Sequence, residues 1–207
     1  MCAVARFGGE EFAMVVAGLS GPVLTQFADR VRQALFAVLE PRLVGARVLD
    51  LCAGSGAAGL EALSRGAESV CFVEASRDAV NVLRRNIDAL DCSGSCRVRH
   101  GDAATAVRPG DVRTGAGSEQ FDLVLFDPPY DYAALRSAVL SALALPHSVL
   151  AIGGLLVATG RRARGEGAGV PPFGLRLVRL LEFGETEVML LERSAEVAAE
   201  DDRGGRG

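Results

Sequence analysis

Short apolar runs alternate with helical stretches through the middle of the chain, and this alternation predicts an α/β fold. Four runs are interpreted as strands: ARVLDL at 46–51, SVCFVE at 69–74, SCRVRH at 95–100 and FDLVLFD at 121–127. The helical stretches that accompany them are 57–64, 78–90 and 132–144. Ser76 is expected to cap the second of these helices. Strands that alternate with helices pair in parallel, so we expect a doubly wound, Rossmann-like sheet.

The last part of the chain departs from this rhythm. VLAIGGLLVATG (149–160) contains a fifth strand, and GLRLVRLLEF (174–183) and TEVMLLER (186–193) then follow with no helix between them. Their short Gly-Glu separation predicts an antiparallel hairpin that closes one edge of the sheet. The complete sheet would have seven strands, mostly parallel, with this hairpin at the C-terminal end.

One long amphipathic pattern precedes the sheet. VLTQFADRVRQALFAVLE (23–40) has the spacing of a single helix. We expect its apolar face to carry Phe27, Val31, Leu35 and Val38.

Length and composition favour one compact domain. The chain has 207 residues, 49% of them hydrophobic, which is enough for one core. We expect an N-terminal hairpin or extension at 1–23, the main domain at 24–193, and a disordered tail at 194–207, which is small, charged and glycine-rich. The apolar runs are shorter than the roughly 18 residues of a membrane helix, and no signal peptide is recognised.

Charge and cysteine content give weaker indications. The net charge of −4 gives no global basic signature of nucleic-acid binding. An odd number of scattered cysteines suits reduced thiols in a cytoplasmic protein better than a disulfide framework; they stand at 2, 52, 71, 92 and 96. Cys92 and Cys96 resemble half of a metal site, but no second pair completes four ligands, so no metal is expected.

A glycine-rich turn follows the first strand directly. Gly54-x-Gly56-x-x-Gly59 opens a helix, and Glu74 lies 20 residues after Gly54 at the end of the second strand. This arrangement is typical of sites for adenosine-containing ligands, because glycine lets a ligand approach the backbone and the acid can hold ribose hydroxyls. The alternative is that the glycines serve only close strand–helix packing. Asp50 would repel a pyrophosphate but suits an ammonium group, which favours S-adenosylmethionine over NAD.

A second motif ends the fourth strand. Asp127-Pro128-Pro129-Tyr130 stands at the carboxyl edge of the predicted sheet, where ligands of open α/β folds bind. A conjugated amino nitrogen is a poor nucleophile, and the Asp127 carboxylate and Pro128 carbonyl could accept its two N–H bonds. The prolines fix the backbone, and Tyr130 offers a face for a stacked base. The alternative is that Pro-Pro only ends the strand.

Both motifs resemble those of class I methyltransferases. LDLCAGSGAAGLEALSRGA is similar to their S-adenosylmethionine loop, and Asp-Pro-Pro-Tyr is the motif of members that methylate exocyclic amino groups of bases or glutamine amides. Together with DRVRQALF and FGETEV, they resemble the bacterial 16S ribosomal RNA guanine-N2 methyltransferase family over about 29–193. The resemblance implies transfer of a methyl group from S-adenosylmethionine to N2 of a guanine, of the guanine(966)-N2 type, in 16S rRNA.

The same resemblance implies the site residues. Asp127, Pro128, Pro129 and Tyr130 would be catalytic. Methyltransferases of this class place an acid against the adenine amino group after the third strand, where Asp102 stands; an ordinary turn aspartate is the alternative. The expected cofactor-binding residues are Asp50, Ala53, Gly54, Ser55, Gly56, Glu74, Ala75, Asp102, Ala103 and Asp127. We expect a monomer that acts on 16S rRNA, either as free RNA or within a 30S particle.

The chain departs from the family at two places. Members carry Arg-Pro-Thr before the first helix, where this chain reads VLTQFADRVR, and a glutamate after the fifth strand, where it reads VATGRR. We therefore expect an intact methyl-donor site and an altered RNA site.

Four other functions compete with this reading. Gly8-Gly9-Glu10-Glu11-Phe12 matches the signature of diguanylate cyclases, but only seven residues precede it, too few for the strand such enzymes need, so we interpret 1–20 as a hairpin. The glycine turn alone fits an NAD-dependent oxidoreductase. Both motifs fit methylation of DNA adenine or protein glutamine. A non-catalytic RNA-binding relative would keep the fold without turnover.

Overall fold

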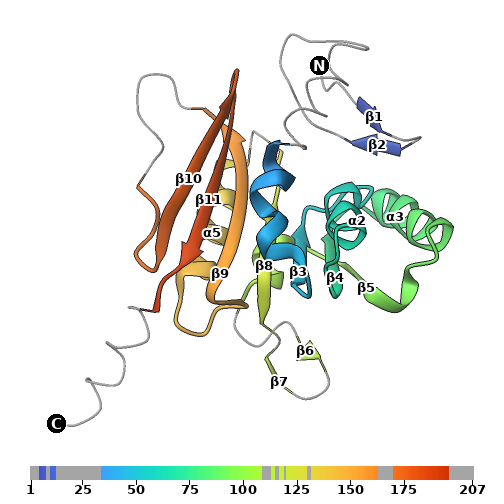
Figure 1. Ribbon diagram of the computed structural model, residues 1–207, viewed down its shortest axis with the longest axis horizontal. Helices are drawn as coiled ribbons and strands as arrows, with labels where there is room; N and C mark the ends of the chain where they lie inside the picture. The colour runs from blue at the N-terminus through green and yellow to red at the C-terminus, as the bar shows by residue number, and fades with distance from the viewer. Residues whose placement is uncertain are drawn as a thin grey trace.

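The computed structural model describes eight stretches of the chain, which are 5–7, 10–12, 34–108, 113–114, 117–118, 120–129, 132–162 and 170–195 (Figure 1). Within the described residues, no helix is long and apolar enough to cross a membrane.

A seven-stranded sheet forms the centre of the molecule, in the order β10-β11-β9-β8-β3-β4-β5. Its five parallel strands are β3 (Arg47–Leu51), β4 (Ser69–Glu74), β5 (Cys96–His100), β8 (Phe121–Phe126) and β9 (Leu150–Arg161). β10 (Leu175–Phe183) and β11 (Thr186–Arg193) are antiparallel and turn at Gly184, which has a φ of 61°. The sequence predictions of seven strands, a parallel centre and an antiparallel C-terminal hairpin are confirmed.

Helices cover both faces of this sheet, as a doubly wound fold requires. On one face, the helical residues 34–43 together with α2 (Ala57–Ser64) and α3 (Arg77–Ala89) pack on one set of strand side chains. On the other face, α4 (Ala103–Ala106) and α5 (Ala133–Ala144) pack on the alternate set. Ser76 caps α3 by accepting the Ala79 N–H, as predicted.

Helical residues 34–43 differ from the prediction in their buried face. Phe36, Leu39 and Leu43 are at most 1% exposed, whereas the predicted Leu35 and Val38 are only partly buried. The helix also continues past its expected end at position 40. Both stripes read as apolar in ALFAVL, so hydrophobicity alone could not choose between them. The predicted Phe27 and Val31 lie outside the described residues.

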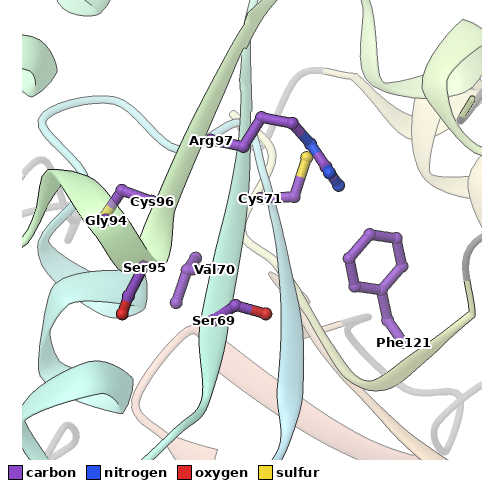
Figure 2. A pocket seen from close by; sticks show the side chains of 8 residues that line it. All are labelled: Ser69, Val70, Cys71, Gly94, Ser95, Cys96, Arg97 and Phe121. Atoms are coloured by element: carbon purple, nitrogen blue, oxygen red, sulfur yellow. The ribbon is translucent and has the colours of Figure 1, made fainter. Parts of the chain in front are cut away.

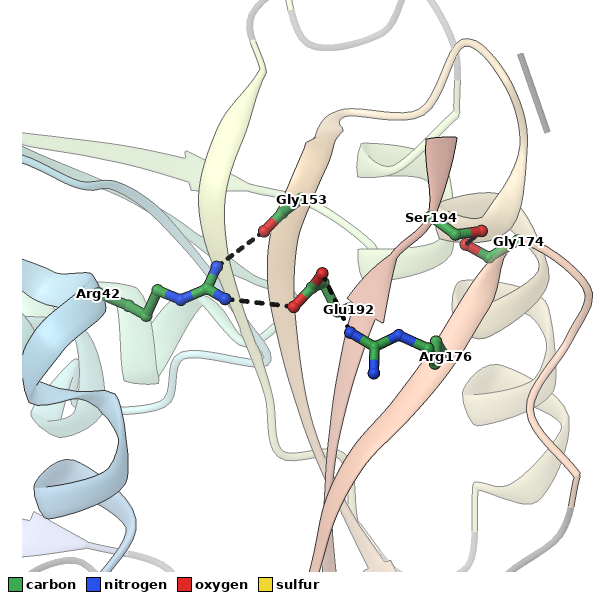
Figure 3. Close-up of polar contacts among 6 residues, drawn as sticks. All are labelled: Arg42, Gly153, Gly174, Arg176, Glu192 and Ser194. Carbon is green, nitrogen blue, oxygen red and sulfur yellow. Dashed lines mark hydrogen bonds and ion pairs between the residues drawn. The ribbon is translucent and has the colours of Figure 1, made fainter. Parts of the chain in front are cut away.

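Arg42 binds this helix to the strands β9 and β11 (Figure 3). Its guanidinium donates to the Gly153 carbonyl at 2.9 Å and to Glu192 Oε2 at 3.2 Å. Glu192 Oε1 in turn accepts from Arg176 at 3.3 Å. One carboxylate of β11 therefore links the helix to the edge strand β10.

Two small hairpins lie outside the main sheet. β1 (Ala5–Phe7) pairs with β2 (Glu10–Phe12) in antiparallel fashion, within the expected N-terminal hairpin. β6 (Arg113–Thr114) pairs with β7 (Gly117–Ser118), also in antiparallel fashion. Most of the tail expected at 194–207 lies outside the described residues, and the proposed division into domains stays a prediction.

A hollow of about 150 Å³ opens at the amino ends of the parallel strands (Figure 2). Ser69, Cys96 and Phe121, the first residues of β4, β5 and β8, line it. Both sequence motifs end strands rather than begin them, so this hollow lies at the edge opposite the candidate site.

Arg193, at the end of β11, is a buried cation that binds only carbonyl oxygens among the described residues. It is 2% exposed and donates to the carbonyls of Leu145, Pro146 and Leu150. Burial lowers the pKa of its guanidinium. Because Leu145 is the C-cap of α5, the positive charge also lies at the negative end of that helix.

We predict that Arg193→Met lowers the free energy of unfolding by about 3 kcal/mol, because it leaves buried carbonyls without donors. Urea denaturation measures this loss. The matched control is Arg176→Met, which removes a 65%-exposed guanidinium and should cost less than about 1 kcal/mol. Equal losses in the two variants would contradict this role for Arg193.

Candidate active site

Four acidic side chains meet at the carboxyl edge of the parallel strands. Asp50 lies in β3, Glu74 ends β4, Asp102 follows β5 and Asp127 follows β8. The negative charges of all four raise the pKa of the Cys52 thiol, which burial raises most, to about 12. The topology thus places the acids predicted from separate motifs around one point.

The glycine loop leaves β3 in an unusual backbone conformation. Cys52, Gly54 and Gly56 have φ values of 60°, 57° and 87°, all in the left-handed region. Cysteine adopts this region rarely, so the loop holds local strain at position 52. Two backbone bonds close the turn, from the Ala53 N–H to the Val73 carbonyl at 3.1 Å and from the Gly56 N–H to the Ala53 carbonyl at 2.8 Å.

The three glycines of the loop are required for different reasons. A Cβ at Gly59 would lie 2.4 Å from Phe72 of β4, and one at Gly56 would lie 2.2 Å from Leu83 of α3, so both glycines allow close packing. A Cβ at Gly54 would meet nothing within 4 Å. The packing alternative therefore accounts for Gly56 and Gly59, while Gly54 keeps an open side that a ligand could approach.

Glu74 fixes the loop through both carboxylate oxygens. Oε2 accepts the Gly54 N–H at 2.8 Å, and Oε1 accepts the Ser76 N–H at 2.7 Å. Each carboxylate oxygen can accept a further bond, so these contacts are compatible with the predicted ribose contact. The sequence indicated the acid but not its role in bracing the turn.

Two further braces were missed from sequence. Asn86 on α3 donates from Nδ2 to the Ser55 carbonyl at 3.0 Å. His100 Nε2 lies 2.9 Å from the carbonyl oxygen of the exposed Ala75. Neither residue belongs to a sequence motif. The fold alone brings Asn86 next to Ser55 and His100 next to Ala75.

Asp50 is buried beneath the loop and is 4% exposed. Its Oδ2 accepts the Gly59 N–H at 3.0 Å. Burial raises its pKa to about 7; the Gly59 bond opposes this rise, and the charges of Asp127 and Glu74 add to it. A cation bound next to Asp50 would favour its ionised form, and the predicted contact with an ammonium group stays a prediction.

Asp102 and Ala103 begin α4. The Asp102 side chain is exposed and accepts the Thr105 N–H at 2.9 Å through Oδ1, so it caps this short helix. This is the role of the turn-aspartate alternative. Ala103 is buried in the core between α4 and the sheet. The expected contact of Asp102 with an adenine stays a prediction.

The Asp-Pro-Pro segment continues directly from β8. Asp127 is partly buried, Pro128 is buried and Pro129 is exposed. Burial raises the pKa of Asp127, and a hydrogen bond from the Thr159 hydroxyl to Asp127 Oδ1 opposes this rise. Tyr130 lies outside the described residues, so its predicted stacking role is not placed.

α5 starts immediately after this segment and is fastened to the last strands. Arg136 in its first turns pairs with the buried Glu187 of β11 at 2.8 Å. A Cβ at Gly160 would lie 2.7 Å from the Arg136 guanidinium, so glycine makes room for that pair. Arg136 therefore anchors the start of α5 to β11.

Comparison with known proteins agrees with this geometry. The profile of the family described as "Conserved hypothetical protein 95" matches residues 19–192. The chain belongs to this family. It is 32% identical over 124 residues to ribosomal RNA small subunit methyltransferase D of Haemophilus influenzae, covering 58% of the chain and 61% of the relative. It is 36% identical over 118 residues to the Escherichia coli K12 protein of that name, covering 57% and 56%.

Family membership extends to the fold. The solved structure of Escherichia coli yhhF is 31% identical, with a TM-score of 0.70 over 81% of this chain and 86% of that one. Its fold and those of the other structural neighbours are of the class I methyltransferase type, as predicted. The chain spans little more than half the length of the curated relatives it matches.

Other candidate residues have different surroundings. The Cys92 and Cys96 sulfurs lie 3.7 Å apart, and no cluster of three or more metal-ligating side chains occurs in the described part of the chain. Arg161 pairs with Glu185 at 3.2 Å, and Arg162 pairs with Glu182 at 3.0 Å. These two arginines therefore bind the C-terminal hairpin formed by β10 and β11.

We predict that Asp50→Asn stabilises the protein above pH 7. The folded state keeps the Asp50 proton up to about pH 7, whereas the unfolded chain releases it near the ordinary aspartate pKa of 3.8, so stability falls as pH rises between these values. The asparagine cannot ionise, so its gain at pH 8 should be roughly 2–4 kcal/mol.

Urea denaturation from pH 4 to pH 8 measures this gain. The control is Asp122→Asn at the opposite edge, where hydrogen bonds from Arg47 lower the pKa of the carboxyl, so this variant should lose stability at neutral pH. A pH slope in Asp50→Asn equal to that of wild type would contradict the assignment.

Proposed function

We propose that this chain transfers a methyl group from S-adenosylmethionine to the exocyclic N2 amino group of a guanine in 16S rRNA. The observation that carries the proposal is the meeting of Asp50, Glu74, Asp102 and Asp127 around an open glycine loop. Family membership and the names of the relatives support the same activity.

The loop and its acids fit the expected methyl donor. Gly54 has an open side, Glu74 has capacity for hydroxyl donors, and Asp50 is suited to an ammonium group. The same acids would repel the pyrophosphate of NAD. S-adenosylmethionine would supply an electrophilic methyl group on a cationic sulfur. Asp50, Ala53, Gly54, Ser55, Gly56, Glu74, Ala75, Asp102 and Ala103 are the residues proposed to hold it.

The Asp-Pro-Pro segment would receive the acceptor. An amino group on guanine is conjugated with the ring and is weakly nucleophilic until its N–H bonds are held. The Asp127 carboxylate would accept one N–H and the Pro128 carbonyl the other, and Pro129 and Tyr130 would complete the segment. Holding the nitrogen in line with the methyl group supplies most of the rate enhancement. The guanine would have to leave its stack to reach this edge.

The finer assignments belong to the same proposal. The target would be the guanine(966)-N2 type, in free 16S rRNA or in a 30S particle, and the enzyme would work as a cytoplasmic monomer. Where the family carries Arg-Pro-Thr before the first helix, this chain reads VLTQFADRVR, so other residues would have to contact the RNA.

The test supplies labelled S-adenosylmethionine with unmodified 16S rRNA and with 30S particles assembled from it. After nucleoside digestion, chromatography with mass spectrometry should find N2-methylguanosine. Methylated adenine in DNA or methylated glutamine in protein would assign another amino-methyltransferase. Donor binding without any product would assign a non-catalytic relative, and NAD binding without donor binding would assign an oxidoreductase.

We predict that Asp127→Ala binds S-adenosylmethionine like wild type. Its rate of methyl transfer should be at most about a hundredth of the wild-type rate, because one acceptor for the amino group is lost. Isothermal titration measures binding, and the labelled assay measures transfer. Asp88→Ala removes an exposed carboxylate of α3 and serves as the control. Normal turnover in Asp127→Ala would refute the mechanism.

A further inference from the structure

We propose that Thr159 is a positioning residue for Asp127, holding one oxygen of its carboxylate so that the other oxygen receives the acceptor amino group. This inference rests on the proposed function and adds a residue of β9 to the site. Thr159 lies within β9, in the segment VATGRR.

The contact follows from the register of the sheet. β8 and β9 are parallel, and Phe126 is opposite Ala158, so the next residue of each strand lies at the same level. The Thr159 hydroxyl donates to Asp127 Oδ1 and lies 3.5 Å from the Phe126 carbonyl. Threonine is branched at Cβ and has few rotamers in a strand, so its hydroxyl is held in place.

Asp127 gains from such a donor because other acidic groups lie at the same edge of the sheet. The titratable groups that act on one another at this edge are Asp50 of β3, Glu74 of β4 and Cys52 of the loop, together with Asp102 before α4. On α5, the cation of Arg136 pairs with Glu187 of β11. Among the described residues, Thr159 is the hydrogen-bond donor to the Asp127 carboxylate.

Without that bond, two properties of Asp127 change together. The torsion that orients a carboxylate is soft, so the group would lose its fixed direction. A hydrogen bond to the ionised form also favours ionisation, and burial opposes it. Removing the hydroxyl therefore raises the pKa of Asp127, and the carboxylate becomes protonated at higher pH. A protonated carboxyl accepts the amino hydrogen poorly.

The test compares Thr159→Val, which keeps the shape, with Thr159→Ser, which keeps the hydroxyl. With saturating donor and 30S particles, kcat should fall about tenfold in Thr159→Val, while KM for both substrates stays nearly constant. The acid limb of its pH–kcat profile should move to higher pH. Thr159→Ser should restore both kcat and the profile.

Carbon-13 NMR of protein with labelled aspartate carboxyls gives a readout that needs no turnover. The Asp127 signal, assigned with Asp127→Asn, should titrate at higher pH in Thr159→Val than in wild type or Thr159→Ser. An unchanged titration would overturn the inference, as would equal losses of kcat in the valine and serine variants. Absence of methylation by wild type would refute the proposed function, and the titration would still decide whether Thr159 holds Asp127.

Discussion

Hydrogen bonds from loop N–H groups to two carboxylates are the constraint on which the candidate site depends. Glu74 binds the amides on either side of the strand edge, at Gly54 and Ser76, and Asp50 binds the amide of Gly59 inside α2. These bonds let a left-handed, strained turn persist where parallel strands end. They also hold negative charges close together, which a site for a cationic ligand can use and a merely structural turn would avoid.

The sheet and the site edge could be predicted because their signals are local. Alternating strands and helices, a glycine turn after β3 and Asp-Pro-Pro after β8 can each be read within a few residues, and the parallel topology brings them together. Sequence could not predict Thr159 or Asn86, because each acts on a residue more than 30 positions away and belongs to no motif. Likewise, two adjacent apolar stripes hid which face residues 34–43 bury.

The last strands contribute side chains to the candidate site although they carry no sequence motif. β9 supplies the hydroxyl that binds Asp127, and β11 supplies Glu187, which holds Arg136 near the start of α5. β9 thus holds the first residue of the Asp-Pro-Pro segment, and β11 holds the helix α5 that follows the segment. Removing the C-terminal hairpin would disturb the Asp-Pro-Pro segment first, because the side chains that brace the glycine loop come from β4 and α3.

Arg42 has a consequence for the order in which the chain can fold. Its two partners, Gly153 and Glu192, lie 111 and 150 residues further along the sequence. A growing chain that has already made the helix at 34–43 can pack Phe36, Leu39 and Leu43 on β3 and β4 once these strands exist, but it must wait for β11 before Arg42 can bind Glu192. Closing a loop of that length is slow, so the contact between Arg42 and Glu192 forms late. A nascent chain stalled before Glu192 would therefore carry a packed helix that lacks its link to the edge strand β10.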